Sequence, residues 1–179
     1  MEESIKVDIN QITNINSADE VNERIKNEKG LLDLINSRLN LDAVDIRTYN
    51  PLSLAFIGDC VFELIIRTVI VEKGNKSVNA LAKDKNALVN AKKQSEMAEF
   101  LKDHFTEEEA EIYRQGKNAK TANHSKSAAY SEYHRATGLE AVFGYLYLTG
   151  RVERCVELLE TALNFERKYI LQTGKDHGI

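Results

Sequence analysis

Proline occurs once among the 179 residues, at Pro51, and the apolar residues recur mostly at spacings of three and four. The sequence contains no sustained alternation of apolar and polar residues, and no Asn-Gly or Asp-Gly pair of the kind that closes a β-hairpin. The pattern therefore predicts an all-α fold, with helices throughout. A chain of this length can bury a core without disulfides or a structural metal.

Capping residues and glycines set the expected helix ends. At Ser17 and again at Thr106 the sequence has the form of a capping box, and Asn50-Pro51 supplies an N-cap with a first-turn proline. The expected helices cover residues 17–29, 31–39, 51–73, 77–104 with a break near 89–91, a stretch from 106, 131–149 and 152–171. The expected stops are Gly30, Gly74 and Gly150, and residues 117–130 are expected to form a loop.

The chain is expected to consist of a polar, helical N-terminal extension over residues 1–45 and a main domain over residues 46–179. Cys60 and Cys155 lie far apart in apolar surroundings without histidine partners, which argues against a zinc site and predicts two core cysteines. The formal net charge of −4 argues only weakly against a nucleic-acid partner, because the distribution of charge matters more than its sum.

No secretory or membrane-spanning segment is expected. Residues 1–19 are polar and acidic and lack a basic segment followed by an apolar one, so the cytoplasm is the default location. Residues 52–71 are long enough to span a bilayer but contain Asp59, Glu63 and Arg67, whose charges are unfavourable in a membrane. This segment is therefore expected to be a core helix, with no membrane partner.

The polar residues of the expected helix 51–73 lie on one side of an otherwise apolar surface. Asp59, Glu63 and Arg67 are spaced four apart, which stacks them along one face. Glu63 and Arg67 then form an intrahelical ion pair, which is our favoured interpretation of Glu63. The alternative is that Glu63 lies behind a metal ligand and holds the metal's waters.

A second apolar helix, expected within residues 136–149, contains a single ionisable acid, Glu140. An unpaired carboxylate in a core is strongly destabilising, so Glu140 is expected to face a cation or the polar stripe of another helix. Two core helices with isolated carboxylates suit Mg²⁺, with Asp59 and Glu140 as its ligands. The alternative is a solvated stripe and a Glu140 paired with lysine or arginine, and spacing alone favours this alternative.

The segment from residue 112 to residue 131 contains no aspartate or glutamate. Its cations are Arg114, Lys117, Lys120, His124 and Lys126, interspersed with amides and hydroxyls such as Asn118. Such a mixture suits the phosphate backbone of a nucleic acid, although an exposed loop of no function has a similar composition. A more ordinary basic group comprises Lys83, Lys85, Lys92 and Lys93.

These residues resemble a known family. Phe56-Ile-Gly-Asp59-Cys-Val-Phe-Glu63-Leu resembles the signature helix of the ribonuclease III family, and Glu140-Ala-Val-Phe-Gly144-Tyr-Leu-Tyr-Leu resembles its second metal-ligand helix. Two further segments, Gly116-Lys-Asn-Ala-Lys120 and Tyr133-His-Arg-Ala-Thr137, make the match closest to the bacterial Mini-ribonuclease III subfamily. The resemblance covers roughly residues 50–168, with the motifs in the family's order and spacing.

The resemblance implies an all-helical endoribonuclease, homodimeric, that cuts double-stranded RNA by Mg²⁺-dependent phosphodiester hydrolysis. Asp59 and Glu140 match the family's acidic metal ligands and are the expected catalytic residues. The implied substrate is precursor ribosomal RNA, at the paired ends flanking the 23S species, and a ribosomal protein or pre-ribosome is a candidate partner. Because one further helix follows residue 149, no separate double-stranded-RNA-binding domain is expected. The expected RNA-binding residues are Arg114, Lys117, Asn118, Lys120 and Lys126.

At two positions the sequence departs from the larger ribonuclease III enzymes, which carry acids where this chain has Ala55 and Thr137. A sparser, more hydrated metal site is therefore expected, with Glu63 and Thr137 as candidates to lie just outside the ligand shell. The competing hypothesis is a non-catalytic duplex-RNA-binding or ribosome-associated module of the same fold. A purely structural helical dimer is a third hypothesis, which leaves the acid-free segment unexplained.

Overall fold

The structure, a computed structural model, describes residues 30–42, 45–119 and 128–173, apart from the side chains of residue 128 and residues 166–173. The described residues form helices and no strand, which confirms the predicted all-α class. Contacts divide the chain into two units, Met1–Asp42 and Ala43–Ile179. In the first unit α2 (Leu31–Leu39) has no buried residue and ends at Asn40, in the left-handed conformation. The expected helix over residues 17–29 lies outside the described residues.

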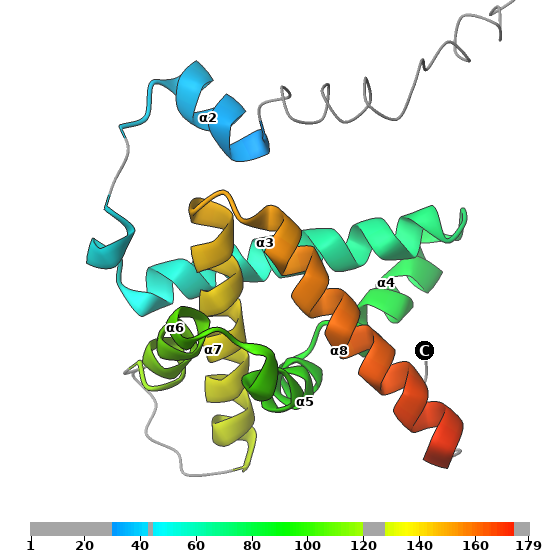
Figure 1. The fold of residues 1–179 in the computed structure, drawn as a ribbon. Coiled ribbons are helices and arrows are strands. Elements are labelled where there is room, and N and C mark those ends of the chain that lie inside the picture. The colour runs from blue at the N-terminus through cyan, green and yellow to red at the C-terminus, as the bar shows by residue number, and fades with distance from the viewer. Residues whose placement is uncertain (1–29, 43–44, 120–127, 174–179) are drawn as a thin grey trace, which may run out of the picture. The chain divides into compact units, whose positions relative to one another are not determined.

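The second unit is organised around α7. Its described elements are η2 (Ile46–Thr48), α3 (Pro51–Glu72), α4 (Val78–Leu88), α5 (Ala91–Leu101), η3 (Lys102–His104), α6 (Glu107–Lys117), α7 (Ala128–Leu148) and α8 (Val152–Thr173). Figure 1 shows α7 at the centre of this unit, crossed by α3 and in contact with α5, α6 and α8.

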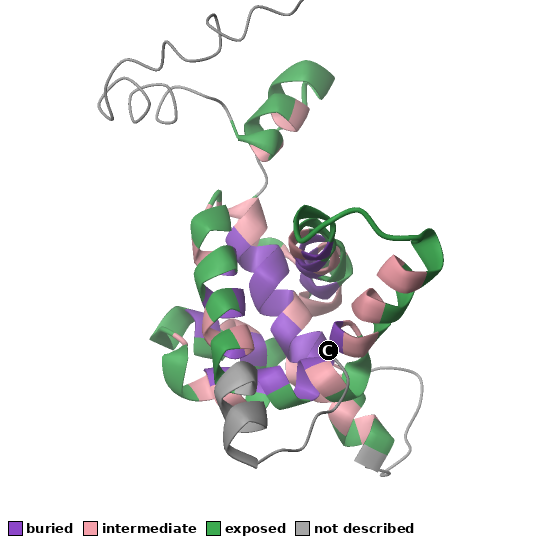
Figure 2. Cartoon of the chain, turned by 90° about the vertical axis from the view of Figure 1, so that its right-hand side faces the viewer, coloured by how far each residue is buried: buried purple, intermediate pink, exposed green. Residues whose placement is uncertain are grey.

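The core lies between α7 and the helices around it, and the buried residues in Figure 2 follow their inner sides. Leu139, Phe143 and Leu146 of α7 are fully buried. Phe143 meets Phe62 of α3 edge to face, with ring centroids 5.2 Å apart. Burying each such side chain stabilises the folded state by roughly 1.5–3 kcal/mol. Helix α7 has the most buried residues and therefore contributes most to the core.

Helices α3 and α7 cross at two glycines. A Cβ atom built on Gly58 would lie 1.8 Å from the carbonyl oxygen of Glu140, and one built on Gly144 would lie 2.0 Å from the carbonyl oxygen of Leu54. No side chain fits at either point, because backbone atoms fill the space. The crossing therefore requires glycine on both helices.

A second close approach joins α6 to α7. A Cβ atom built on Gly116 would lie 2.7 Å from the Cβ atom of Ala141, and one built on Gly138 would lie 2.8 Å from the ring of Tyr113. The C-terminal end of α6 is thereby held against the middle of α7.

The predicted ends of the helices in this unit are largely confirmed. Asn50 caps α3 by accepting a hydrogen bond from the amide of Leu52, 2.9 Å away. Both halves of the Thr106 capping box are present at the start of α6. The expected break near residues 89–91 separates α4 from α5, and Gly150, with φ of +75°, joins α7 to α8.

Two expectations about local structure are wrong. Helix α7 begins at Ala128, not near Ser131, because alanines have the highest helix propensity and extend the helix without adding to its apolar pattern. Cys60 is exposed, whereas Cys155 is buried as expected. Cys60 lies between Phe56 and Leu64 on a face of α3 that other described residues leave exposed. No helix in the described part of the chain has the length and apolar character that crossing a membrane requires.

The glycine crossing predicts a large and local effect of one methyl group. Gly58→Ala should reduce the free energy of unfolding by roughly 3 kcal/mol or more, because backbone atoms cannot rotate away from the added methyl. Urea denaturation followed by circular dichroism measures the change. Gly30→Ala is the matched control, since its Cβ would lie 3.8 Å from the nearest atom, Asp33 Oδ2, and the expected change is about 1 kcal/mol or less. Equal effects of the two substitutions would contradict the tight crossing.

Candidate active site

The crossing of α3 and α7 brings the two predicted metal ligands together. Asp59 follows Gly58 directly, and Gly58 lies against the backbone of Glu140. Asp59 is exposed and Glu140 is partly buried, and the charge of Asp59 raises the pKa of the Glu140 carboxyl group. Asp59 therefore reaches solvent while Glu140 lies behind it, within range of its charge.

Glu140 is in an unfavourable environment for a carboxylate. Burial, and after it the charge of Asp59, raises the pKa of Glu140 to about 7, and the Gln94 side chain opposes this shift in part. None of the ion pairs found among the described residues includes Asp59 or Glu140. Two adjacent carboxylates without a neutralising side chain form a site that favours a cation.

Glu63 lies one turn beyond Asp59 and is already neutralised. Arg67 Nη2 lies 3.0 Å from Oε2 of Glu63, which confirms the predicted ion pair, and Lys85 Nζ lies 2.9 Å from Oε1. A hydrogen bond from Lys85 is the largest cause that lowers the pKa of Glu63. No group of three or more histidine, cysteine, aspartate or glutamate side chains suited to a metal occurs in the part of the chain described. The candidate site at the crossing of α3 and α7 therefore consists of two carboxylates, Asp59 and Glu140.

Thr137, the other candidate for a place just outside the ligand shell, is buried one turn before Glu140. Its hydroxyl donates a hydrogen bond to the carbonyl oxygen of Tyr133, 3.0 Å away in the same helix. The hydroxyl proton is therefore engaged within α7.

The candidate RNA-binding residues that the structure describes lie at the C-terminal end of α6. Arg114 is exposed and forms a bidentate pair with Glu111, at 2.8 and 2.6 Å. Lys117 is partly buried, and its carbonyl oxygen lies 2.7 Å from His134 Nδ1. Asn118 is exposed at the end of the helix. Lys120 and Lys126 lie outside the described residues.

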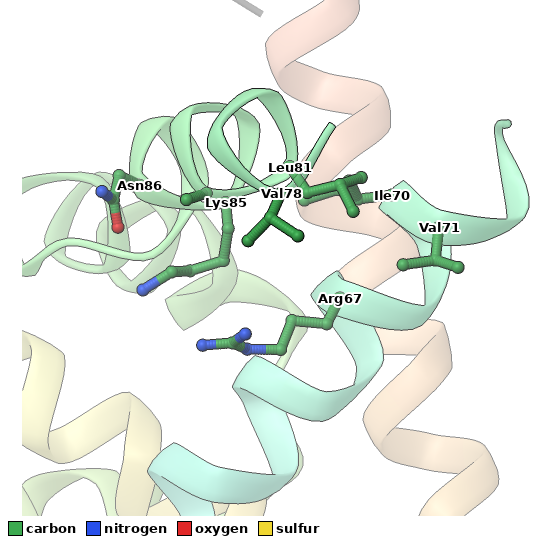
Figure 3. Close-up of a pocket in the computed structure, with 8 residues that line it drawn as sticks. Arg67, Ile70, Val71, Val78, Leu81, Lys85 and Asn86 are labelled. Atoms are coloured by element: carbon green, nitrogen blue, oxygen red, sulfur yellow. The ribbon is translucent and has the colours of Figure 1, made fainter. Parts of the chain in front are cut away.

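A groove of about 400 Å³ lies between α3 and α4, away from the paired carboxylates. Figure 3 shows Arg67 and Lys85 pointing into it from the two helices, beside the apolar side chains of Ile70, Val71, Val78 and Leu81. Neither Asp59 nor Glu140 lines the groove.

Comparison with known proteins identifies the family. The Ribonuclease III domain family matches residues 52–151, which include both carboxylates and the end of α6. The chain is 37% identical to the Mini-ribonuclease 3 of Clostridium tetani, over 75% of this chain and 89% of that protein. It is 40% identical to the Mini-ribonuclease 3 of a Thermoanaerobacter species, over 76% of this chain and 96% of that protein.

A crystal structure of a Fusobacterium nucleatum protein is similar as well, with a TM-score of 0.59 and 36% identity over 68% of this chain and 98% of that one. The chain belongs to the Mini-ribonuclease 3 group of the ribonuclease III family. It is therefore an endoribonuclease, a hydrolase, as the motifs predicted. Within this ribonuclease III domain, sequence analysis missed Gln94 and gave Lys85 no particular role, because both reach the site from other helices.

The raised pKa of Glu140 predicts a pH-dependent stability. The unfolded chain ionises this carboxyl near its ordinary pKa of 4.5, whereas the folded protein keeps the proton up to about pH 7. The folded state therefore binds more protons between these values, and its stability falls as the pH rises through them. We expect Glu140→Gln to be more stable than the wild type above pH 7, by on the order of 2 to 3 kcal/mol, and to lose this advantage near pH 4.5. Denaturant unfolding from pH 4 to 8 in a chelator measures the difference.

Glu111→Gln is the matched control for this measurement. Hydrogen bonds from Arg114 and Gln115 lower the pKa of Glu111 to about 2, so this group titrates below the window. In the unfolded chain Glu111 ionises near its ordinary pKa of 4.5, so its replacement should leave the slope of stability unchanged from about pH 6 to pH 8. A stability difference between Glu140→Gln and the wild type that does not grow with pH would contradict the burial of an unneutralised carboxyl group.

Proposed function

We propose that this chain hydrolyses phosphodiester bonds in double-stranded RNA, with Mg²⁺ held by Asp59 and Glu140. The observation that carries the proposal is the pair of adjacent carboxylates at the crossing of α3 and α7, without a side-chain cation among the described residues. Carboxylate oxygens are the protein ligands that Mg²⁺ prefers, and the ion often takes one or two of them and keeps several waters. The donor set therefore fits this metal.

When bound, the ion would supply an activated water and offset the negative charge that develops on the phosphorane-like transition state and the leaving oxygen. Glu140 must lose the proton that its burial favours before it can act as a ligand, so metal binding releases a proton. Asp59 is exposed and offers its oxygens from the side that RNA approaches. Glu63, one turn beyond Asp59, is held by Arg67 and Lys85 and would lie just outside the ligand shell.

We infer that the duplex is held along the C-terminal end of α6 and the segment that follows it. Arg114, Lys117 and Asn118 lie there, and the Gly116 approach keeps this end against α7, the helix that carries Glu140. Lys120 and Lys126 follow in the sequence and add two more positive charges. Cations and amides of this kind bind phosphate oxygens without reading sequence, which suits an enzyme that recognises a duplex.

The proposed enzyme is a homodimer that joins through α3. Phe56 and Leu64 are 79% and 56% exposed, and Cys60 lies exposed between them at a spacing of four residues. Such a row on one helix is typical of a surface that another apolar surface covers. Asp59 is exposed next to Cys60 on the same helix, so a symmetric pairing through this face would place both copies of Asp59 near the interface.

The proposed physiological substrate is precursor ribosomal RNA, at the paired ends flanking the 23S species, which implies action in the cytoplasm. A ribosomal protein or pre-ribosome is the proposed partner that presents these ends. Support for this substrate comes from the resemblance to Mini-ribonuclease 3 proteins.

The first test is cleavage of a labelled RNA duplex, compared with its single strand and with the DNA equivalent. Asp59→Asn should lower duplex cleavage at least a hundredfold while leaving the fold intact, because it removes the charge of one ligand and keeps its shape. Cleavage by the wild type should require Mg²⁺ and stop in a chelator. Binding of the duplex without cutting in any divalent metal would instead support the non-catalytic RNA-binding module.

The control for Asp59→Asn is Asp84→Asn, which removes a surface aspartate paired with Lys76 at 2.6 Å on another part of the unit. Its cleavage rate should stay within about twofold of the wild type, because an exposed ion pair of this kind contributes little. An equal loss of activity in both variants would mean that the effect is not specific to the paired carboxylates.

The proposed dimer has its own test. Leu64→Glu should shift the protein from dimer to monomer in sedimentation velocity, because a charge would be buried in the apolar contact. Val156→Glu, at an apolar residue of α8 that is 47% exposed, is the control and should leave the association state unchanged. A dimer unaffected by Leu64→Glu would exclude this face of α3 as the interface.

A further inference from the structure

Arg135 of α7 is an arginine that no carboxylate of the described residues neutralises. The other arginines of the second unit whose side chains are described each pair with an aspartate or a glutamate; they are Arg47, Arg67, Arg114, Arg151 and Arg154. None of the ion pairs found in the described part of the chain includes Arg135. Its positive charge therefore remains available to an external anion.

Two serine hydroxyls hold the guanidinium group of Arg135. Its Nε atom donates to Oγ of Ser95, a buried residue of α5, at 2.6 Å. Its Nη1 atom donates to Oγ of Ser131, an exposed residue one turn earlier in α7, also at 2.6 Å. The third nitrogen, Nη2, donates to none of the residues that the structure describes. Hydroxyl partners orient an arginine without cancelling its charge.

The C-terminal end of α6 lies beside Arg135 and carries a second cation. The carbonyl oxygen of Lys117 lies 2.7 Å from Nδ1 of His134, the residue before Arg135. A carbonyl oxygen only accepts hydrogen bonds, so the imidazole donates from Nδ1 and holds this helix end against α7. Lys117, like Arg135, takes part in no ion pair between described residues.

Glu99 of α5 is an acid within range of both cations, and it has a closer partner. Lys102 Nζ lies 2.5 Å from Oε1 of Glu99. The hydrogen bond from Lys102 is the largest cause that lowers the pKa of the Glu99 carboxyl group, and the charges of Arg135 and Lys117 lower it further, in opposition to burial. Glu99 therefore senses both cations without pairing with either.

An oriented guanidinium with an uncompensated charge fits the phosphate oxygens of a nucleic-acid backbone. Its planar N–H groups match phosphate geometry, and the serines have already ordered the side chain that must bind. Arg114, an RNA-binding candidate from the sequence, is less suited, because its Nε and Nη2 atoms donate to the carboxylate of Glu111.

We propose that Arg135 binds a phosphate group of the RNA backbone, with its guanidinium oriented by Ser95 and Ser131 and with Lys117 beside it. This inference rests on the proposed function, since it takes duplex RNA as the substrate. Arg135 precedes Glu140 by five residues, which is a rise of about 7.5 Å along α7. The bound phosphate therefore belongs to the stretch of duplex next to the cleavage site.

The test is the binding of a labelled RNA duplex to the full chain in a chelator, measured by fluorescence anisotropy from about 50 to 200 mM salt. Arg135→Gln removes the charge and keeps an amide that can donate to the serines. Its affinity should be roughly tenfold or more below that of the wild type, because a hydrogen bond to a charged group is lost. The slope of the logarithm of affinity against the logarithm of salt should become less steep by about 0.9, as expected for one lost phosphate contact.

Cleavage with Mg²⁺ gives an independent readout. In Arg135→Gln the KM for the duplex should rise roughly tenfold while kcat stays within about threefold, because the lost contact binds substrate and transition state alike. Arg135→Lys keeps the charge without the planar fork. Its salt slope should match that of the wild type, and its affinity should lie between those of the wild type and Arg135→Gln.

Arg47→Gln is the matched control. Arg47 is exposed and pairs with Asp45 at 2.6 Å, so this substitution removes the same charge from the same unit. Its RNA affinity and salt slope should equal those of the wild type. An equal change in Arg47→Gln and Arg135→Gln would overturn the inference, because net charge alone would then explain it.

An unchanged salt slope in Arg135→Gln, with salt-dependent duplex binding by the wild type, would overturn this inference and leave the proposed function standing. With a lower unfolding midpoint as well, that result would make Arg135 a structural bridge between α5 and α7. If Arg135→Gln does not fold, wild-type affinity in Arg135→Lys would overturn the inference, and a loss of threefold or more would support it. A wild type that neither binds nor cuts the duplex would instead refute the proposed function, and this inference with it.

Discussion

The arrangement of this protein depends on the contact between two helix backbones at Gly58 and Gly144. Side chains ordinarily keep helix axes 8–10 Å apart, and only glycine allows backbone atoms of one helix to touch those of another. Here the touching atoms are those of Gly58 and of Glu140 itself. Because Asp59 is the next residue on α3, the same contact that packs the core also brings the two carboxylates into range of each other.

A comparison within the molecule shows how the surroundings of Glu140 differ from those of another buried glutamate. Glu109 is even more deeply buried, yet Arg154 Nε lies 2.9 Å from its Oε1, and the amide of Thr106 donates to its Oε2 at 2.9 Å. Burial opposes the ionisation of Glu109, but these partners together lower its pKa. The chain thus neutralises one buried glutamate with its own arginine, while at Glu140 the nearest charge is another carboxylate. Glu140 is therefore a buried carboxyl group that forms none of the ion pairs found among the described residues, and such perturbed groups mark candidate functional sites.

The sequence predicted those features that depend on local chemistry. The ends of α3 followed from Asn50 and Pro51, because capping is settled within a few residues, and Glu140 was found because a lone acid in an apolar segment is visible without coordinates. The exposure of Cys60 was not predictable in this way. A helix that is apolar nearly all round gives no sign of which side the rest of the chain leaves uncovered, and that side is decided by the glycine crossing.

Gln94 and Lys85 were out of reach for a related reason. Each lies on a short helix of ordinary amphipathic character, and each matters only because α4 or α5 packs beside α3 or α7. The Glu63–Arg67 pair is intrahelical and was predicted, whereas the stronger influence on Glu63, from Lys85, joins two helices. Sequence spacing identifies the candidate ligands, and tertiary packing identifies the groups that lie beside them.

The same packing explains why the candidate site has two carboxylates where the resemblance suggests room for four. Ala55 is buried in a small cluster with Leu54, Ala141 and Tyr145, and Thr137 is buried with its hydroxyl bonded to its own helix. An acid at either position would add negative charge to a region in which Glu140 already retains its proton up to about pH 7. Further carboxylates here would be protonated or would destabilise the crossing, unless a second cation accompanied them. Two carboxylates are therefore the number that this core can hold in the absence of a cation.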